Sequence, residues 1–293
     1  MDNLQQLGYT TIDDNDPDKG ILIRPLITIV IANYNYGQYI ETAIGSALNQ
    51  DYPGPLQICV VDDGSTDDSW EKIQNIVGTD TTKKDDLEIA EKVVVRPDGY
   101  EVSVIAIKRP NGGASVARNT AINYTWEETN AFAILDADDE YYPNKVSKMV
   151  RKMIEDPTRI GVVYADYEIH DHNSGKIVRE FKQPYNRNVL MNECIVHSNA
   201  LISKRAFSMV KEERGFYDPD LHGPGGEEFI GCAEDYDLWI RISEQFMIVH
   251  IPESLAVANI TGLNQTTNVN PEVFSKNWHY IMTKVQNRAN GQK

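Results

Sequence analysis

The chain has 293 residues, 41% hydrophobic and 25% charged, a composition typical of a soluble globular protein and too apolar for a disordered one. It carries 44 acidic and 28 basic side chains, a formal net charge of −16, which argues against a general nucleic-acid binder because such proteins present a basic surface. An anionic substrate would therefore need a local basic patch or a bound cation. The three cysteines contain no CxxC pair, which suits a reducing cytoplasm, and no run approaches the roughly 20 apolar residues of a membrane-spanning helix.

The first half of the chain alternates predicted strands and helices, after an N-terminal extension over residues 1–25 that is too polar and acidic for a secretory signal. Short continuous apolar runs predict buried strands at Ile27–Ala32, Leu56–Val61 and Ala131–Leu135. Helices are predicted over 40–48, from a capping box at Ser65 and Asp68 to Val77, from Gly112 to Tyr124, and over Asn144–Glu155. This alternation predicts an α/β protein with a mostly parallel central sheet and helices on both faces.

The remaining segments are less regular. Residues 78–86 are predicted to be a loop, and a turn at Pro97-Asp98-Gly99 predicts a hairpin. Beyond residue 160 the pattern predicts, in order, strands over 161–169 and 176–181, a helix over 204–211, a loop over 215–231, a helix over 235–244, a strand over 246–251 and a helix over 271–288.

Acidic side chains gather where predicted parallel strands end, which is where open α/β sheets bind their ligands. Asp62 and Asp63 follow one such strand, and Asp136, Asp138 and Asp139 follow another. Three carboxylates within four residues repel one another unless protons or a cation neutralise them, and their oxygens suit Mg²⁺ or Mn²⁺. The alternative in both places is a solvated acidic turn, since Asp and Gly are common turn residues.

Two further segments allow both a structural and a functional interpretation. Gly112 and Gly113, with Arg118 one turn later, either simply enter a helix or bind phosphate through backbone N–H groups. Glu234 and Asp235 at a predicted helix start either complement the helix dipole or take part in chemistry. The chain has no Walker phosphate loop, no GxGxxG after the first strand, and no HExxH or GxSxG motif.

Six segments then form a distinctive series: ITIVIANY at 27–34, SALNQ at 46–50, VVDDGST at 60–66, NGGASVARNTA at 111–121, LDADD at 135–139 and EDYDLW at 234–239. In order and spacing this series resembles the family-2 inverting glycosyltransferases of the GT-A fold, over about residues 26–260. The resemblance implies a Rossmann-like, mostly parallel sheet and a smaller acceptor-side sheet. It divides the domain 26–260 into a nucleotide-sugar half, 26–140, and an acceptor half, 141–260, followed by a C-terminal helical segment, 261–293.

The resemblance also implies roles in nucleotide-sugar binding for five residues. Tyr34 would flank the nucleobase, with Ala32 beside it. Asp63 would contact the base or the ribose. Arg118 would lie near the donor, as would Asp136, the first acid of the DxD motif.

For metal binding and chemistry the resemblance points to the DxD and ED motifs. Asp138 is the first candidate ligand for Mn²⁺ or Mg²⁺, with Asp136 and Asp139 as further candidates. Asp235 is the candidate catalytic base, expected to be kept ionised by the helix dipole, and Glu234 is its competitor.

One departure from the family pattern lies late in the chain. Many relatives carry an Arg or His that helps to hold the metal or the diphosphate, whereas this chain has Asn259-Ile260-Thr261-Gly262. His222 or Arg241 is the candidate replacement. The loop Gly223-Pro224-Gly225-Gly226 is predicted to act as a lid over the substrate.

The cysteine pattern and the polar N-terminus predict a cytoplasmic protein, and the resemblance implies a metal-dependent, inverting enzyme. It would move a sugar from a nucleoside diphosphate donor, with UDP-sugars first, to a hydroxyl group of a glycan or lipid-linked acceptor. Nucleic acid is not expected as a partner, and peripheral membrane contact stays open. The alternatives are a nucleotidyltransferase, for which the usual GxGxR loop is missing, and a catalytically silent nucleotide-sugar-binding module.

Overall fold

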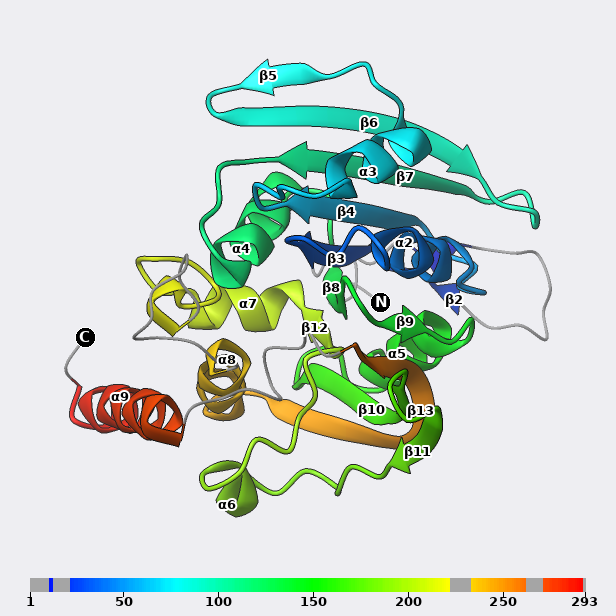
Figure 1. Cartoon of the computed structure of the whole chain (residues 1–293). Helices are drawn as coiled ribbons and strands as arrows, with labels where there is room; N and C mark the ends of the chain where they lie inside the picture. The colour runs from blue at the N-terminus through cyan, green and yellow to red at the C-terminus, as the bar shows by residue number, and fades with distance from the viewer. Residues whose placement is uncertain (1–10, 13–21, 222–232, 262–270, 292–293) are drawn as a thin grey trace.

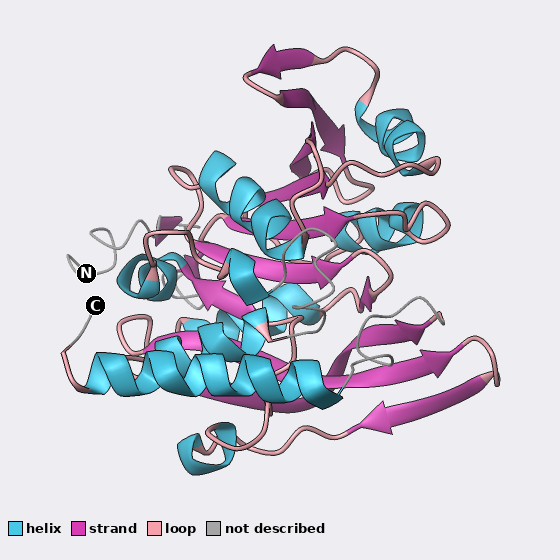
Figure 2. Ribbon diagram, turned by 60° about the vertical axis from the view of Figure 1, so that its left-hand side comes forward, coloured by secondary structure: helices cyan, strands magenta, loops and turns pink. Residues whose placement is uncertain are grey.

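A single large sheet organises the chain in the computed structural model, which describes residues 11–12, 22–221, 233–261 and 271–291. Within these residues eleven strands form one sheet, and helices cover both of its faces (Figures 1 and 2). A separate two-stranded ribbon, β1 with β2, lies in the N-terminal extension. The predicted α/β, GT-A-type fold class is confirmed.

The strands are β1 (Thr11–Ile12), β2 (Leu22–Ile23), β3 (Ile27–Asn33), β4 (Leu56–Asp62), β5 (Thr82–Lys84), β6 (Leu87–Val95), β7 (Glu101–Lys108), β8 (Ala131–Asp136), β9 (Glu140–Tyr141), β10 (Ile160–Asp171), β11 (Lys176–Glu180), β12 (Leu201–Ser203) and β13 (Met247–Ile260). The helices are α2 (Ile40–Leu48), α3 (Ser69–Val77), α4 (Ala114–Tyr124), α5 (Lys145–Met153), α6 (Arg187–Leu190), α7 (Lys204–Val210), α8 (Glu234–Ser243) and α9 (Pro271–Ala289), with a 3₁₀ turn η1 (Pro219–Leu221).

The order of strands in the sheet is β5-β6-β7-β4-β3-β8-β12-β10-β13-β9, and β11 pairs with β10. Its centre is parallel, because β7, β4, β3 and β8 all run in one direction. Antiparallel β12 then joins β8 to β10, which runs parallel to β13. The strands beyond β12 are thus continuous with the parallel centre in one sheet.

Two apolar layers hold the helices to this sheet. Successive side chains of each central strand point to opposite faces, so each strand contributes to both layers. In β3, Ile27, Ile29 and Ile31 pack with α2, α3 and α5 on one face, whereas Val30 packs on the other face with α4, α7, α8 and α9. All four side chains are fully buried. Burial on both faces explains why β3 is a continuous apolar run, as expected for a central parallel strand.

Most predicted elements are present, with three corrections. The capping box does not form, because α3 begins only at Ser69. The Ser65 hydroxyl oxygen instead accepts hydrogen bonds from the Asn33 side chain and the Asn35 backbone N–H. The predicted loop over 78–86 contains the short strand β5. The strand expected over 246–251 extends to Ile260 as β13, because it follows β10 along its length.

Polar contacts join the loops that follow β3 and β4. The Asn33 side chain donates to Asp62 Oδ2 (3.0 Å), and the Asn35 carbonyl oxygen Oδ1 accepts from the Thr66 backbone N–H (2.8 Å). Gly64 is required here: its φ is +76°, and a Cβ at this position would lie 2.8 Å from the Asn111 nitrogen. These contacts fix the edge of the sheet where the predicted site lies.

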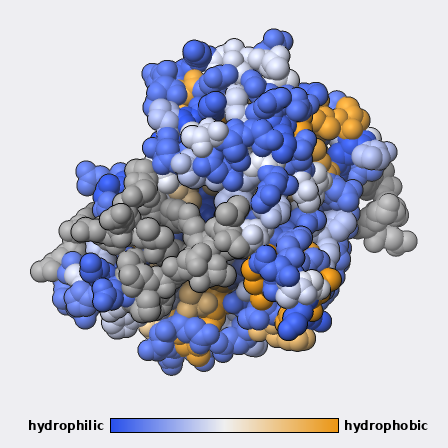
Figure 3. Space-filling model, in the orientation of Figure 1, coloured by the Kyte–Doolittle hydropathy of each residue, from blue (hydrophilic) through white to orange (hydrophobic). Residues whose placement is uncertain are grey.

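The molecular surface is mostly hydrophilic on the face drawn in Figure 3, in keeping with the high net charge. No helix among the described residues is long and apolar enough to cross a membrane.

Candidate active site

The carboxyl ends of the parallel strands bring the acidic motifs to one edge of the sheet. In the strand register, Ala32 on β3 lies beside Asp136 on β8, and Asn33 lies beside Asp62 on β4. Asp62 in turn lies beside Lys108 at the end of β7. Motifs that are more than 70 residues apart in sequence therefore share one edge, as the strand assignments predicted.

The predicted nucleobase position is open to solvent. The Tyr34 side chain is 45% exposed, the most accessible part of this loop, and Ala32 beside it is half-buried although it belongs to a central strand. An exposed aromatic ring next to an accessible backbone offers a planar ligand a surface on which to stack.

The Asp63 carboxylate is already engaged within the protein. It accepts hydrogen bonds from the backbone N–H groups of Gly112 (3.0 Å) and Gly113 (2.6 Å) and pairs with Arg109. Burial raises the pKa of Asp63, against the opposing effect of the Gly112 amide and Arg109. In this arrangement Asp63 anchors the start of α4, so the two glycine amides point at a side chain rather than at a phosphate.

Arg118 connects the DxD and ED segments. From α4 it donates to Asp136 Oδ1 (2.9 Å) and to Glu234 Oε1 (2.7 Å), and its guanidinium lies 5.4 Å from the centroid of the Tyr217 ring. Burial alone would lower the pKa of Arg118, but the charges of Asp235, Asp136 and Glu234 raise it well above its ordinary value. One buried guanidinium thus holds the DxD loop and the start of α8 together.

The three acids of the DxD segment have different surroundings. Asp136 accepts from Arg118 and from the Ser198 hydroxyl (2.8 Å), and although burial opposes it, the Arg118 charge lowers the Asp136 pKa. Asp139 accepts from the Asn199 side chain (3.0 Å) and the Asn259 backbone N–H (3.1 Å). Burial and the nearby Asp136 raise the pKa of Asp138 to about 7.

Sequence reasoning missed the residues that support this loop. Ser198 and Asn199 precede β12, and Asn259 lies near the end of β13, so all three reach the DxD loop from the acceptor side. Asn259 belongs to the segment where the resemblance leads us to expect an Arg or His: its Nδ2 donates to the Asp138 carbonyl (2.7 Å), and its Oδ1 lies 2.9 Å from Nε2 of His172. Only the polar run His197-Ser198-Asn199 before an apolar segment offered a signal in the sequence.

Asp235 differs from its neighbour Glu234. Asp235 is 9% exposed, and its Oδ1 is buried without a hydrogen-bond partner among the described residues. Burial raises the pKa of Asp235 to about 8; Arg118 opposes this shift, while Glu234 adds to it. The helix dipole is expected to favour the ionised form of Asp235, and burial opposes it by favouring the neutral form.

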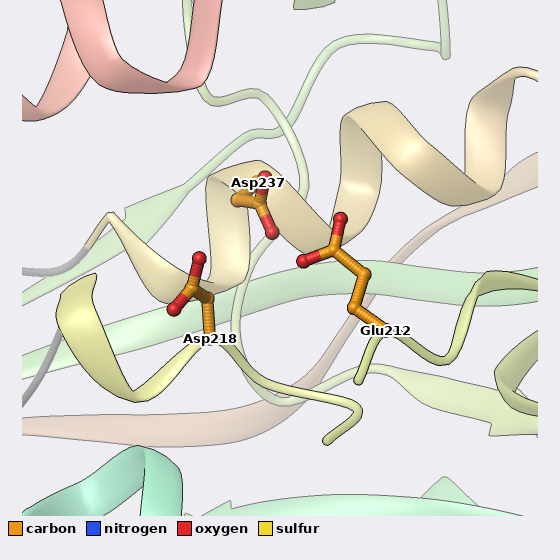
Figure 4. A group of neighbouring side chains, drawn as sticks. All are labelled: Glu212, Asp218 and Asp237. Carbon is orange, nitrogen blue, oxygen red and sulfur yellow. The ribbon is translucent and has the colours of Figure 1, made fainter. Parts of the chain in front are cut away.

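A second acidic group lies on the other side of α8. Figure 4 shows Glu212, Asp218 and Asp237 turned toward one another, and the Lys284 ammonium from α9 lies 2.8 Å, 2.8 Å and 3.1 Å from their oxygens. Arg241 also pairs with Asp237 (2.7 Å). Protein cations thus neutralise this group, which attaches α9 to the acceptor half.

The contacts of Arg241 show whether it can replace the missing Arg or His. Arg241 is buried and donates to Asp237, the Val210 carbonyl and the Phe216 carbonyl, so the suggestion that it compensates at the metal site is wrong. His222 and the predicted lid Gly223–Gly226 lie outside the described residues.

Comparison with known proteins places this geometry in a family. The family model described as "Glycosyl transferase family 2" matches residues 28–209. The chain is 24% identical over 265 residues to a chondroitin synthase of Pasteurella multocida, covering 90% of this chain and 23% of that protein. It is 27% identical over 251 residues to an uncharacterized glycosyltransferase of Rickettsia prowazekii, covering 83% of this chain and 66% of the relative. The chain thus spans about a quarter of the length of the synthase.

Solved structures agree in fold. TarS of S. aureus, residues 1–349 in complex with UDP-GlcNAc, superimposes with a TM-score of 0.61 at 17% identity, covering 89% of this chain and 66% of that one. A mannosyltransferase of Pyrobaculum calidifontis in complex with GDP-Man and Mn²⁺ gives 0.56 at 17% identity, covering 94% and 74%. The chain belongs to glycosyltransferase family 2 and has a GT-A-type fold.

Proposed function

We propose that the protein transfers a sugar from a nucleoside diphosphate donor, UDP-sugars first, to a hydroxyl group of a glycan or lipid-linked acceptor, with inversion at the anomeric carbon. The observation that carries this proposal is the Arg118 bridge. By contacting both Asp136 and Glu234, Arg118 places the nucleotide edge of the sheet next to Asp235, which is the proximity that a transfer reaction needs. The relatives that bind UDP-GlcNAc and GDP-Man support a nucleotide-sugar donor.

The residues fit a divalent cation at Asp138. A buried carboxyl group whose pKa is raised to about 7 by burial and by Asp136 gains most when a cation neutralises it. Asp136 is close enough to raise that pKa, whereas both Asp139 oxygens already accept hydrogen bonds, so Asp139 supports the loop. Mn²⁺ or Mg²⁺ held by Asp138 would offset the charge of the departing diphosphate. The Mn²⁺ complex of the mannosyltransferase supports this assignment.

Asp235 is the proposed base. It takes the proton of the acceptor hydroxyl while that oxygen forms the new bond to the anomeric carbon, and the bond to the diphosphate oxygen breaks on the opposite face. Glu234 is less suited to this task because its Oε1 is held by Arg118. Tyr34 and Ala32 would flank the nucleobase. Asp63 would reach the base or ribose only by exchanging its present partners.

The silent binding module is the main rival, and the burial of Asp235 argues against it. A binding module needs no base, yet this chain keeps a carboxyl group buried with its pKa raised to about 8. Such groups destabilise a fold and cluster at functional sites. The wide separation of the cysteines suits a cytoplasmic enzyme, and a lipid-linked acceptor would bring it into peripheral contact with a membrane.

The test is a panel of UDP-, GDP- and dTDP-sugars incubated with Mn²⁺ or with EDTA, in the presence of mixed saccharide acceptors. We expect one nucleotide class to release its diphosphate, only with the metal, and to give a product whose anomeric configuration is inverted by NMR. Release of pyrophosphate from a nucleoside triphosphate and a sugar phosphate would identify a nucleotidyltransferase instead. Binding without turnover across the panel would identify the binding module.

A further inference from the structure

A basic and aromatic group lies beside the proposed active site, on the acceptor half. Tyr167 comes from β10, Lys182 follows β11, and His197 comes just before Ser198. The Tyr167 and His197 rings are 4.1 Å apart between centroids, and the Lys182 ammonium lies 5.5 Å from the centroid of the Tyr167 ring. Each of the three residues is half-buried, so each keeps some surface in contact with solvent.

Contacts with neighbouring residues hold Lys182 and His197 in place. The Lys182 backbone N–H donates to Oδ1 of the buried Asp166 (2.9 Å), which fixes the backbone from which the Lys182 side chain extends. The Tyr167 ring supports the ammonium through a cation–π contact. The backbone N–H of Asn199 donates to Nδ1 of His197 (3.1 Å), so this neutral tautomer carries its proton on Nε2, which is then a second donor.

The group adjoins the DxD segment. The residue after His197, Ser198, donates to Asp136, and the next, Asn199, donates to Asp139. The Lys182 charge acts on both His197 and Cys194, and Cys194 in turn lies within the electrostatic reach of Asp235. Lys182 therefore lies near the segment that supports the DxD loop.

Lys182 also differs from the two arginines of the site. Arg109 and Arg118 form ion pairs with Asp63 and Asp136. By contrast, within the part of the chain that the structure describes, Lys182 has no carboxylate oxygen within 4.0 Å. In a chain with a net charge of −16, a positioned ammonium of this kind is available to a ligand rather than to the protein.

We propose that Lys182, with Nε2–H of His197 beside it, binds an anionic group, a carboxylate or a phosphate, on the acceptor saccharide. Lysine is a compact point charge that suits either anion, and a charge-assisted hydrogen bond on a partly buried ammonium is stronger than a neutral one. This inference rests on the proposed function, because it names the class of acceptor used by the same site. The substrate would be an acidic glycan rather than a neutral one.

The experiment first separates this inference from the proposed function. Mn²⁺-dependent release of UDP from UDP-sugars by water alone, without any acceptor, measures donor chemistry and does not involve Lys182. Acceptors are then compared as three matched oligosaccharides: one ending in glucuronate, its carboxyl-reduced form ending in glucose, and that form phosphorylated at C6. The variants are Lys182→Met, Lys182→Arg and, as a control, Lys176→Met, an exposed lysine of β11.

We expect the wild-type protein to use at least one acidic acceptor with a higher kcat/KM than the neutral form. Lys182→Met should raise KM for that acceptor about 10- to 100-fold, the range for a hydrogen bond to a charged group, and leave water-dependent UDP release and the neutral acceptor unchanged. Lys182→Arg should recover most of the loss, and Lys176→Met should behave as wild type.

Four outcomes would overturn the inference. They are a wild-type enzyme indifferent to acceptor charge, an equal loss on acidic and neutral acceptors in Lys182→Met, the same loss in Lys176→Met, and charge discrimination that follows a uronate on the donor sugar. Absence of nucleoside diphosphate release from every UDP-, GDP- and dTDP-sugar would instead overturn the proposed function, and this inference with it.

Discussion

Arg118 makes two adjacent carboxylates chemically different. It forms an ion pair with Glu234 Oε1 at 2.7 Å and none with Asp235, although one oxygen of each acid is buried without a hydrogen-bond partner among the described residues. Helix spacing alone could not distinguish the two, because adjacent residues at a helix start both lie near the same edge. The buried guanidinium therefore assigns the base role to Asp235 in the proposed mechanism.

The pH dependence of turnover follows from Asp235. A general base must be ionised, and burial raises the pKa of this group to about 8, so kcat/KM should rise with pH and level off above about 8. The measurement is a pH profile of kcat/KM, which reports groups of the free enzyme, at saturating Mn²⁺. A profile that is flat from pH 6 to 9 would contradict the assignment.

Asp138 and Asp139 should separate metal binding from folding. Asp138→Ala should weaken binding of the nucleoside diphosphate and remove its dependence on Mn²⁺, measured by calorimetry. Asp139→Asn, the matched control, should mainly lower stability, by about 1–3 kcal/mol, because its oxygens accept hydrogen bonds from Asn199 and Asn259. Unchanged Mn²⁺-dependent binding in Asp138→Ala would show that the ligand is assigned to the wrong residue.

At the scale of elements, sequence patterns predicted the long or buried strands and helices. They did not predict short strands, or loop positions that depend on contacts between residues far apart in the sequence. The β3 and β4 strands could be predicted because burial on both faces leaves a continuous apolar run. The strands β9 and β12 have only two and three residues, too few for any periodicity. The supporting contacts of Ser198 and Asn259 with the DxD loop join residues more than 60 positions apart, which no local pattern encodes.

The attachment of α9 depends on Lys284. Its ammonium lies within 3.1 Å of three acidic side chains, two of which are buried. Among the described residues, removing the charge leaves Asp218 without its ion pair and Asp237 with Arg241 alone. Lys284→Met should lower the free energy of unfolding by about 3–5 kcal/mol in urea denaturation. Arg159→Met, which removes an exposed pair with Asp156, should change it by less than about 1 kcal/mol. Equal effects of the two substitutions would contradict the structural role of this group.

At the scale of the whole molecule, the net charge of −16 opposes binding of an anionic donor. Two guanidinium groups at one edge of the sheet, Arg109 and Arg118, already pair with Asp63 and Asp136, so the proposed divalent cation would resolve this conflict. The net charge can be read from the sequence. The ion pair between Arg109 and Asp63 cannot, because it depends on how the loops after β4 and β7 meet.

Ligand-induced stabilisation should therefore require the metal. A nucleoside diphosphate at about 100 times its Kd should stabilise the protein by about 2.7 kcal/mol and raise its Tm, but only when Mn²⁺ is present. Thermal unfolding with UDP, GDP and dTDP, each with Mn²⁺ or with EDTA, measures this and identifies the preferred base. A nucleotide that raises Tm equally in EDTA would contradict metal-dependent binding.

The most direct test of catalysis at this site is the single-turnover rate of sugar transfer by Asp235→Asn, measured beside Glu234→Gln and the affinity of each for the donor. Asparagine keeps the size of the side chain and removes its basic oxygen, so transfer by Asp235→Asn should fall by about 10²- to 10⁴-fold while its donor Kd stays at the wild-type value. Glu234→Gln should lose less of the rate, through a weakened contact with Arg118. Transfer by Asp235→Asn at close to the wild-type rate, together with loss of transfer in Glu234→Gln, would contradict the account and make Glu234 the base.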